Sequence, residues 1–346
     1  MRRPGVLEML EEGKPLKICA PMVTQFSNPI LYNTRLEFEK TFLKFRKMEL
    51  HFRHLVRKWG CDVAFTPMIT ADSFVKSEKA READFSTDPD DRPLIVQFGS
   101  SSPSDIVDAA EYIARVSDGI DINCGCPQKW AIAEKIGGYL LTHPDIIQDM
   151  IVQLRNRIPD ETFTKSIKIR IDPDIRKSVD LCQQLEAAGV SFITVHGRTL
   201  KQKNEPADWD AIKVIKDSVR IPVFANGDIK TSEDIVKVVA DTGVDGVMSA
   251  NGLLANPAMF SGHDVTPMEC VQDWLDINER DKSCPFRVFH HHLIWMTEKQ
   301  MSKADRIKFS DFTTKEKVVD FITNHFELQN PAERSPTPRE SSSLDD

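Results

Sequence analysis

The sequence lacks the features that mark several classes of protein. No apolar run reaches the roughly 18–20 residues that a membrane-spanning helix needs, which argues against a transmembrane protein. The first residues are basic, but neither an apolar stretch nor a small-residue cleavage site follows, as a secretory signal would require. These absences predict a soluble protein of the cytoplasm, or else of the nucleus.

The cysteines lack the arrangement that disulfides or a zinc ion would need. There are seven, an odd number, scattered through a chain of 346 residues that is large enough to fold without cross-links. Cys124 and Cys126 stand close together, but no second Cys or His pair follows at a fixed spacing. We therefore expect reduced thiols and no metal site.

Net positive charge is also missing, since the formal charge is −8 at pH 7. Taken alone, this charge argues against a nucleic-acid partner, but what attracts phosphate is a local basic surface. Basic residues do cluster, at positions 44–47, 53–58, 165–170 and 201–203. Charge therefore leaves the partner undecided.

Short β-branched runs alternate with longer amphipathic runs from residue 16 to residue 261. The strand candidates are near-continuous apolar runs, as expected for parallel strands that are buried on both faces. They are residues 17–21, 63–66, 94–98, 119–123, 166–170, 192–196, 221–225 and 246–249. Helical patterns lie between them, at 104–114, 144–155, 175–188, 209–216 and 232–239. Residues 142–145 and 231–234 have the polar caps and early acids of helix starts.

Eight such units in about 245 residues predict an α/β fold of the (β/α)8 TIM-barrel type. The rival fold, a doubly wound open sheet, usually carries a glycine-rich phosphate-binding turn after its first strand. Here the first strand leads into Ala20, Pro21 and Met22, with no glycine. The barrel is therefore preferred.

The strand pattern ends near residue 261, which divides the chain into four parts. Residues 1–15 are an N-terminal extension, and residues 16–261 are the barrel. Residues 262–327 carry three helical patterns and predict a small C-terminal α-helical domain; the patterns are 273–279, 289–302 and 314–326. Residues 328–346 are rich in Pro, Ser and Glu and are predicted to be a disordered tail.

Polar residues and turn residues stand at nearly every predicted strand end, whereas the strand bodies are apolar. In this fold the active site is built at the C-terminal ends of the strands. The residues delivered there are Ala20, Pro21, Met22, Gln97, Asn123, Cys126, Lys168, Arg170, His196, Arg198, Asn226, Gly227, Asp228, Asn251 and Gly252. Each alone could be a turn or core residue, but their recurrence from strand to strand indicates a binding site.

The residues after the last two strands favour a flavin. Asn226 to Asp228, and Asn251 with Gly252, stand where such barrels bind a phosphate through backbone N–H groups. Lys168 and His196 suit an electron-rich ring that becomes anionic on reduction. Gln97 offers a donor and an acceptor to the ring edge. The set fits flavin mononucleotide (FMN), and a nicotinamide cofactor would visit rather than reside.

Cys126 follows the fourth predicted strand and can serve as a general acid. A thiol of ordinary pKa, about 8.5, is mostly protonated at neutral pH. The alternatives are a nucleophile, which needs an adjacent His base, and a buried structural thiol. Beside a hydride donor, an acid completes the reduction of an activated double bond.

These residues resemble a known family, the tRNA-dihydrouridine synthases. The motifs that carry the resemblance are residues 20–22, 121–128, 168–170, 196–199 and 225–228, and the Asn-x-Gly-Cys-Pro element is highly specific. The resemblance covers residues 16 to about 327. Segments 65–69, 128–131 and 252–258 look most like the eukaryotic branch that acts at D-loop positions 20a and 20b.

The resemblance implies an FMN-binding barrel and a helical tRNA-binding domain, in a protein expected to be a monomer. NADPH (or NADH) would reduce the flavin, and the flavin would pass a hydride to C6 of a flipped-out uracil, which Cys126 would protonate at C5. The flavin would be held by Ala20, Pro21, Met22, Gln97, Lys168, His196, Asn226, Gly227, Asp228, Asn251 and Gly252. Asn123 and Arg170 would contact the flavin or the target base, and Arg198 would bind the substrate.

Two features depart from the family pattern. Many relatives have Arg where this chain has Asn251, so a cationic contact to the phosphate is missing. Residues 24–45 interrupt the first βα loop, and removing them restores the family register. This insertion is interpreted first as a product of alternative splicing or of a faulty gene model. The other interpretations are a lid or tRNA contact, and an interruption that disables the site.

Two alternative functions remain open at this point. One is a flavin barrel dehydrogenase that acts on free pyrimidines, which would not need residues 262–346. The other is a tRNA-binding protein that the insertion has inactivated. A yellow purified protein would argue against the second.

Overall fold

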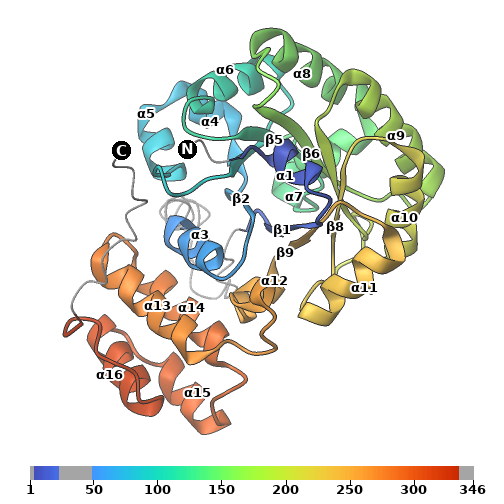
Figure 1. The fold of residues 1–346 in the computed structure, drawn as a ribbon. Coiled ribbons are helices and arrows are strands. Elements are labelled where there is room, and N and C mark those ends of the chain that lie inside the picture. The colour runs from blue at the N-terminus through green and yellow to red at the C-terminus, as the bar shows by residue number, and fades with distance from the viewer. Residues whose placement is uncertain (1–3, 23–48, 335–346) are drawn as a thin grey trace, which may run out of the picture.

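The predicted (β/α)8 barrel is present in the computed structural model, which describes residues 4–22 and 49–334 (Figure 1). Its strands are β1 (Leu16–Cys19), β2 (Val63–Phe65), β4 (Leu94–Gly99), β5 (Gly119–Cys124), β6 (Thr164–Arg170), β7 (Phe192–His196), β8 (Val223–Asn226) and β9 (Gly246–Ser249). All pairs are parallel, β1 pairs with both β2 and β9, and β2 pairs with β4, so the sheet closes. A short β3 (Ile69–Thr70) pairs with the end of β4.

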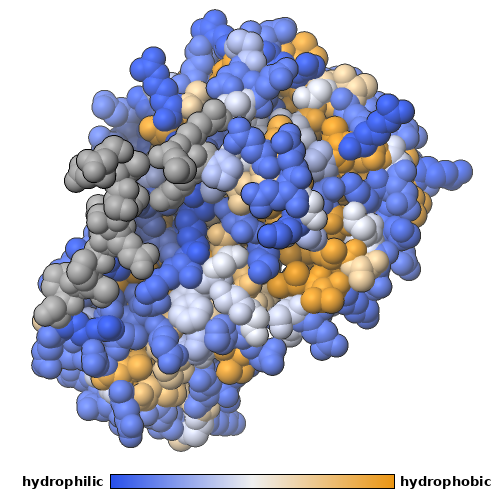
Figure 2. Space-filling model, in the orientation of Figure 1, coloured by the Kyte–Doolittle hydropathy of each residue, from blue (hydrophilic) through white to orange (hydrophobic). Residues whose placement is uncertain are grey.

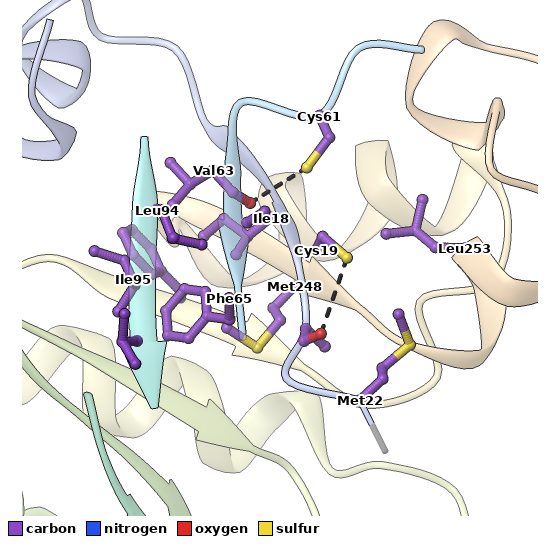
Figure 3. Packing of buried hydrophobic residues seen from close by; sticks show 14 of the residues in the cluster. Ile18, Cys19, Met22, Cys61, Val63, Phe65, Leu94, Ile95, Met248 and Leu253 are labelled. Carbon is purple, nitrogen blue, oxygen red and sulfur yellow. Dashed lines mark hydrogen bonds between the residues drawn. The ribbon is translucent and has the colours of Figure 1, made fainter. Parts of the chain in front are cut away.

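The strands form where the sequence is apolar because both of their faces are buried. Ile18 is paired in register with Val63 on one side and with Met248 on the other. Figure 3 shows these side chains packed with Phe65 and Ile95 from the neighbouring strands. Residues at paired positions point to the same side of the sheet, so this packing fills part of the barrel interior.

Helices surround the barrel at the predicted places. They are α6 (Pro103–Ile113), α8 (Pro144–Arg157), α9 (Ile175–Ala188), α10 (Trp209–Ser218) and α11 (Ser232–Thr242). The predicted start at Thr231 is confirmed by a capping box with Asp234. At α8 the helix begins at Pro144, but the side chain of His143 makes no cap bond, so the predicted polar cap is wrong there. Proline at the first position replaces it.

Shorter elements complete the barrel domain. They are α1 (Val6–Glu11), α3 (Glu49–Lys58), α4 (Ala71–Lys76), α5 (Glu78–Asp84), α7 (Lys129–Ala133), the 3-10 turn Gly137–Thr142, α12 (Asn251–Ala255) and the 3-10 turn Met259–Ser261. α1 lies at the end of the barrel where the strands begin, since Gly5 approaches the Thr162 carbonyl just before β6. The predicted insertion, residues 24–45, lies outside the described residues.

Within residues 262–334, four helices follow the barrel, and they lie beside it (Figure 1). They are α13 (Met268–Arg280), α14 (Phe286–Thr297), α15 (Lys303–Ser310) and α16 (Lys315–His325). The predicted helix 289–302 is wrong at its end, and α15 was not predicted. Ser302 accepts a hydrogen bond from the backbone N–H of Asp305 and so starts a new helix, whose mostly polar residues give little periodic signal.

The helical part is anchored to the barrel through α3. The Trp59 indole N–H donates to the Asp273 carboxylate on α13 at 3.0 Å. His51 of α3 lies 3.1 Å from the backbone oxygen of Asp281, directly after α13. Figure 1 shows α3 between the barrel and these helices. α3 therefore joins the two parts.

Residues 328–334, which were predicted to belong to a disordered tail, are bound to α13. Gln272 of α13 accepts from the backbone N–H of Gln329 at 2.9 Å and donates to its oxygen at 3.1 Å. Arg334 pairs with Asp276 at 2.7 Å. Hydrogen bonds to α13 thus fix residues that composition alone assigns to disorder, while residues 335–346 lie outside the described part of the chain.

The surface shown in Figure 2 is mainly hydrophilic, with apolar side chains in separate groups. Within residues 4–22 and 49–334, no helix combines the length and apolar character needed to cross a membrane. The same residues contain no group of three or more His, Cys, Asp or Glu side chains that could hold a metal ion.

A buried imidazole between the two parts of the molecule gives a pH prediction. His292 of α14 is fully buried, with Phe52 of α3 stacked at 4.4 Å and Trp274 of α13 at 4.8 Å between ring centroids. Burial lowers the pKa of His292 to about 3. In the unfolded chain this imidazole is protonated below about pH 6.5, whereas in the folded chain it stays neutral down to about pH 3. The free energy of unfolding therefore falls as the pH falls from about 6.5 towards 3.

We expect His292→Phe to remove much of this acid sensitivity. For His292 the loss of unfolding free energy between pH 7 and pH 5 should be about 2 kcal/mol. Urea unfolding at the two pH values measures it, and the exposed His325→Gln serves as the control. An unchanged difference between the two pH values in His292→Phe would show that other groups cause the acid sensitivity.

Candidate active site

The structure brings the predicted residues of the central strands together at one end of the barrel. Asn123 is paired in register with Lys168, and Arg170 with His196, which in turn pairs with Asn226. Gln97 contacts Asn123 from the neighbouring β4. These residues stand at the C-terminal ends of their strands, as the fold requires of an active site.

A chain of hydrogen bonds links the Cys126 loop to the barrel interior. Asn123 Oδ1 accepts from the backbone N–H groups of Gly125 at 3.1 Å and Cys126 at 2.9 Å. Asn123 Nδ2 donates to Gln97 Oε1 at 2.8 Å, and Gln97 Nε2 donates to Asp121 Oδ2 at 2.7 Å. Both side-chain amides, offered by the sequence as contacts for flavin or base, are therefore partly engaged within the protein. The second N–H of each amide has no acceptor among the described residues.

Cys126 is held in a loop that leaves its thiol half-buried. Its backbone oxygen accepts from Gly138 at 2.9 Å, and Gly137 lies so close that a Cβ there would be 2.7 Å from the Cys126 Cβ. Burial raises the pKa of the thiol, although the Gln128 backbone, Arg170 and Lys168 oppose the shift. The thiol is therefore protonated at neutral pH, which suits an acid better than a nucleophile.

Cys124 differs from Cys126 although it is only two residues away. It is fully buried, and burial raises the pKa of its thiol well above the ordinary value, with Asp121 adding to the effect. A thiol in this setting acts as a small apolar side chain.

Lys168 presents a cation to the end of the barrel. Burial lowers the pKa of its ammonium to about 8, helped by Arg170 and opposed by Asp121. Among the described residues, no acceptor lies within hydrogen-bonding distance of Nζ. An ammonium placed in this way is available to an anionic or electron-rich ligand.

His196 is neutral and its tautomer follows from its neighbour. Burial lowers the pKa of the imidazole to about 2, and Lys168, Arg170 and Arg198 add to the shift. Nε2 lies 3.2 Å from Arg198 Nη1, which can only donate. The proton therefore sits on Nδ1, which makes Nδ1 a hydrogen-bond donor.

Arg198 and Asp228 contact each other across the loops after β7 and β8. Arg198 donates to Asp228, to the Glu205 backbone oxygen and to His196. Asp228 also pairs with Lys230 at 2.9 Å and accepts from a backbone N–H. Burial raises the pKa of Asp228, but these donors outweigh it and hold the pKa well below the usual range. Arg198, predicted to meet the base, thus directs three of its five N–H groups to partners within the protein.

Arg170 makes a similar internal contact. Its Nη1 donates to the backbone oxygen of Thr199 at 2.9 Å and to that of Gln202 at 3.3 Å. Burial lowers the pKa of the guanidinium, and Arg198 adds to the shift. Arg170 therefore ties β6 to the loop after β7, beside the Cys126 loop.

The loops after β8 and β9 pack closely on each other. A Cβ on Gly252 would lie 2.6 Å from the Ile229 oxygen, and one on Gly227 would lie 2.8 Å from the Ala207 Cβ. Gly227 also has φ +113, a conformation that few other residues adopt. Asn226 Nδ2 donates to the Met248 oxygen at 2.8 Å. The predicted phosphate loops thus lie side by side.

The remaining predicted positions are less centrally placed. Asn251 is exposed at the start of α12. The Ala20 N–H donates to the Ser249 oxygen at 3.0 Å, and Met22 is buried in the packing shown in Figure 3, with Pro21 half-buried between them. These residues shape the site through backbone and packing.

Polar groups inside the strand bodies were not predicted from the sequence. Asp121 is fully buried and accepts from Gln97 and, at 2.8 Å, from Ser166 Oγ on β6. Burial raises the pKa of its carboxyl to about 6, against the donors Gln97 and Ser166 and the nearby Lys168. The available signal was an aspartate between Ile120 and Ile122 in the predicted strand 119–123.

Thr194 of β7 supplies a stability prediction. Its Oγ1 is buried and has no hydrogen-bond partner within the described part of the chain. Thr194→Val keeps the shape and removes the unsatisfied hydroxyl, so the unfolding free energy should rise by about 1 kcal/mol. Urea unfolding measures it. Thr164→Val, whose hydroxyl bonds the Asp118 oxygen at 3.3 Å, should lower stability instead. A loss of stability in Thr194→Val would show that the hydroxyl is bonded.

Comparison with known proteins agrees with this geometry. The sequence model of the family described as Dihydrouridine synthase (Dus) matches residues 45–341. The chain belongs to the dihydrouridine synthase family. The resemblance predicted from the motifs is thereby confirmed, and the match begins where the predicted insertion ends.

Named relatives match nearly the whole chain. A Homo sapiens protein named tRNA-dihydrouridine(20a/20b) synthase [NAD(P)+]-like is 44% identical over 325 residues, which cover 94% of this chain and 95% of that protein. A Schizosaccharomyces pombe protein named tRNA-dihydrouridine(20a/20b) synthase [NAD(P)+] is 37% identical over 95% of this chain and 93% of its own length. A Saccharomyces cerevisiae protein of the same name is 34% identical over 93% of this chain and 83% of its own length.

Proposed function

We propose that this protein reduces uridine to dihydrouridine in tRNA, with FMN as hydride donor and Cys126 as proton donor. The observation that carries the proposal is the Cys126 thiol, kept protonated beside Lys168 and Arg170 at the end of a family barrel. An enzyme that reduces a carbon–carbon double bond needs a proton donor next to its hydride donor. The thiol meets this need.

The residues present fit FMN. Lys168 has an ammonium and His196 has an Nδ1–H, and neither has an acceptor among the described residues. Gly227 and Gly252 allow a close approach of backbone that a Cβ would block, in the loops where such barrels hold a phosphate. When bound, FMN supplies the hydride. Lys168 would offset the negative charge of the reduced ring, and the spare N–H of Gln97 would orient it.

Cys126 and Asn123 would act on the base. The raised pKa keeps the proton on Cys126 Sγ until the base accepts it at C5. The Asn123 side chain holds the loop, and its spare N–H is free to contact the base. NADPH or NADH would supply electrons, in keeping with the names of the relatives. Action at positions 20a and 20b, a cytoplasmic location and a monomeric state are further parts of the proposal.

The test is a reaction with purified protein. The protein should be yellow, and with NADPH and unmodified tRNA it should produce dihydrouridine detectable by mass spectrometry after digestion. Free uridine, the substrate of the alternative pyrimidine dehydrogenase, should remain unchanged. Product from free uridine but not from tRNA would contradict the proposal. A colourless protein that takes up no flavin would contradict it as well.

A further inference from the structure

Asp121 lies too deep to touch a base or a ring directly, yet it ends the hydrogen-bond chain that reaches Cys126. Its side chain is fully buried inside the barrel, and it accepts from Gln97 on β4 and from Ser166 on β6. Gln97 itself is 1% exposed. A buried amide without an acceptor is unfavourable, so Gln97 depends on this carboxylate for its position.

The donor and acceptor roles in this series of hydrogen bonds are fixed at both of its ends. At the loop, the N–H groups of Gly125 and Cys126 can only donate, so they require Asn123 Oδ1 to face them. Asn123 Nδ2 must then face Gln97 Oε1, and Gln97 Nε2 must face the interior. An acceptor is needed at that end, and Asp121 Oδ2 is that acceptor at 2.7 Å.

We propose that Asp121 is a positioning residue for the acid, which holds the Cys126 loop closed through Gln97 and Asn123. This inference rests on the proposed function for its catalytic meaning, but the positioning itself is a property of the folded chain. Without an acceptor at residue 121, the Gln97 amide turns or moves to find a partner. Asn123 then loses its own partner, and the loop that carries the thiol is freed.

Three substitutions separate hydrogen bonding from charge. Asp121→Asn keeps an oxygen for Gln97, while its NH2 can donate to Ser166 Oγ, whose own proton can turn to the Ile120 oxygen at 3.4 Å. Asp121→Leu has the same branching at Cγ but no acceptor. If Asp121 instead served as a counter-charge to Lys168, both variants would behave alike. Gln97→Met removes the amide that connects Asn123 to Asp121.

The measurement is the rate at which iodoacetamide alkylates Cys126 in the full-length protein, followed by peptide mass spectrometry without tRNA or NADPH. A freed loop exposes the half-buried thiol, so Asp121→Leu and Gln97→Met should raise the rate by about tenfold. Asp121→Asn should stay near the wild-type rate. The buried thiols of Cys182 and Cys270 report global opening in the same digest, and Thr194→Val controls for a change in the barrel interior.

Two results would overturn the positioning role. One is a wild-type alkylation rate at Cys126 in Asp121→Leu while Cys182 and Cys270 stay protected. The other is equal acceleration in Asp121→Asn and Asp121→Leu, which would assign the effect to charge. If Asp121→Leu unfolds, Gln97→Met decides: faster alkylation confined to Cys126 supports the role, and an unchanged rate removes it.

An activity assay separates this inference from the proposed function. Asp121→Leu should lower the rate of dihydrouridine formation, whereas Asp121→Asn should form dihydrouridine at a rate close to that of the wild type. If the wild-type protein makes no dihydrouridine while the alkylation pattern appears as expected, the proposed function fails and the positioning role stands. If dihydrouridine forms but the alkylation pattern is absent, the proposed function stands and the positioning role fails.

Discussion

Replacing Cys126 with alanine is expected to lower the rate of dihydrouridine formation by about 10²–10⁴-fold, the range for loss of a general acid. The structure gives the reason, because the half-buried thiol keeps its proton at neutral pH, with the raised pKa that burial causes. Flavin content and tRNA affinity should change little, since Asn123 holds the loop through backbone N–H groups that alanine retains. Single-turnover kinetics with pre-reduced enzyme measures the step.

Cys124→Ala is the matched control for this prediction. It removes a thiol two residues away that is fully buried and has no role in the proposed chemistry. Its effect should be confined to stability. Equal rates in Cys126→Ala and wild type would show that another group or water donates the proton.

Gly252→Ala is expected to weaken FMN binding by about tenfold or more. The added methyl group would lie 2.6 Å from the Ile229 oxygen and from Ser249 Oγ, so the loops after β8 and β9 must separate. Overpacking of this kind costs about 1–3 kcal/mol, and 1.4 kcal/mol is tenfold in affinity. The change should fall on the cofactor because these loops form the proposed phosphate site.

Flavin titration monitored by fluorescence measures this affinity. The control is Gly243→Ala, which lies at the end of α11 with φ +68 and has nothing within 4 Å of the new methyl group. It should cost stability through backbone strain but leave FMN affinity unchanged. Wild-type affinity in a folded Gly252→Ala protein would place the phosphate elsewhere.

The barrel could be predicted from sequence because each strand is buried on both faces and reads as an apolar run. The site could be located for a related reason, since polar residues such as Gln97, Lys168 and His196 stand where those runs end. What each polar group contacts could not be predicted. Arg198 and Asp228 pair across two loops, and that pairing depends on loop geometry that no local pattern encodes.

The features that were not predicted, or were predicted wrongly, also have physical causes. The contacts of Asp121 could not be predicted, because the direction of a side chain inside a barrel depends on strand register across β4, β5 and β6. Helix α15 is short and mostly polar, so it gives little periodic signal. Residues 328–334 look disordered by composition, but α13 supplies hydrogen bonds that order them.

The most direct test is to map dihydrouridine by mass spectrometry in tRNA from cells that lack this protein, rescued with wild type or with Cys126→Ala. We predict that dihydrouridine disappears at positions 20a and 20b in the deletion, returns with the wild-type protein, and does not return with the alanine variant. Undiminished dihydrouridine at those positions in the deletion would contradict the assigned function and site, and full rescue by Cys126→Ala would contradict the role of the thiol.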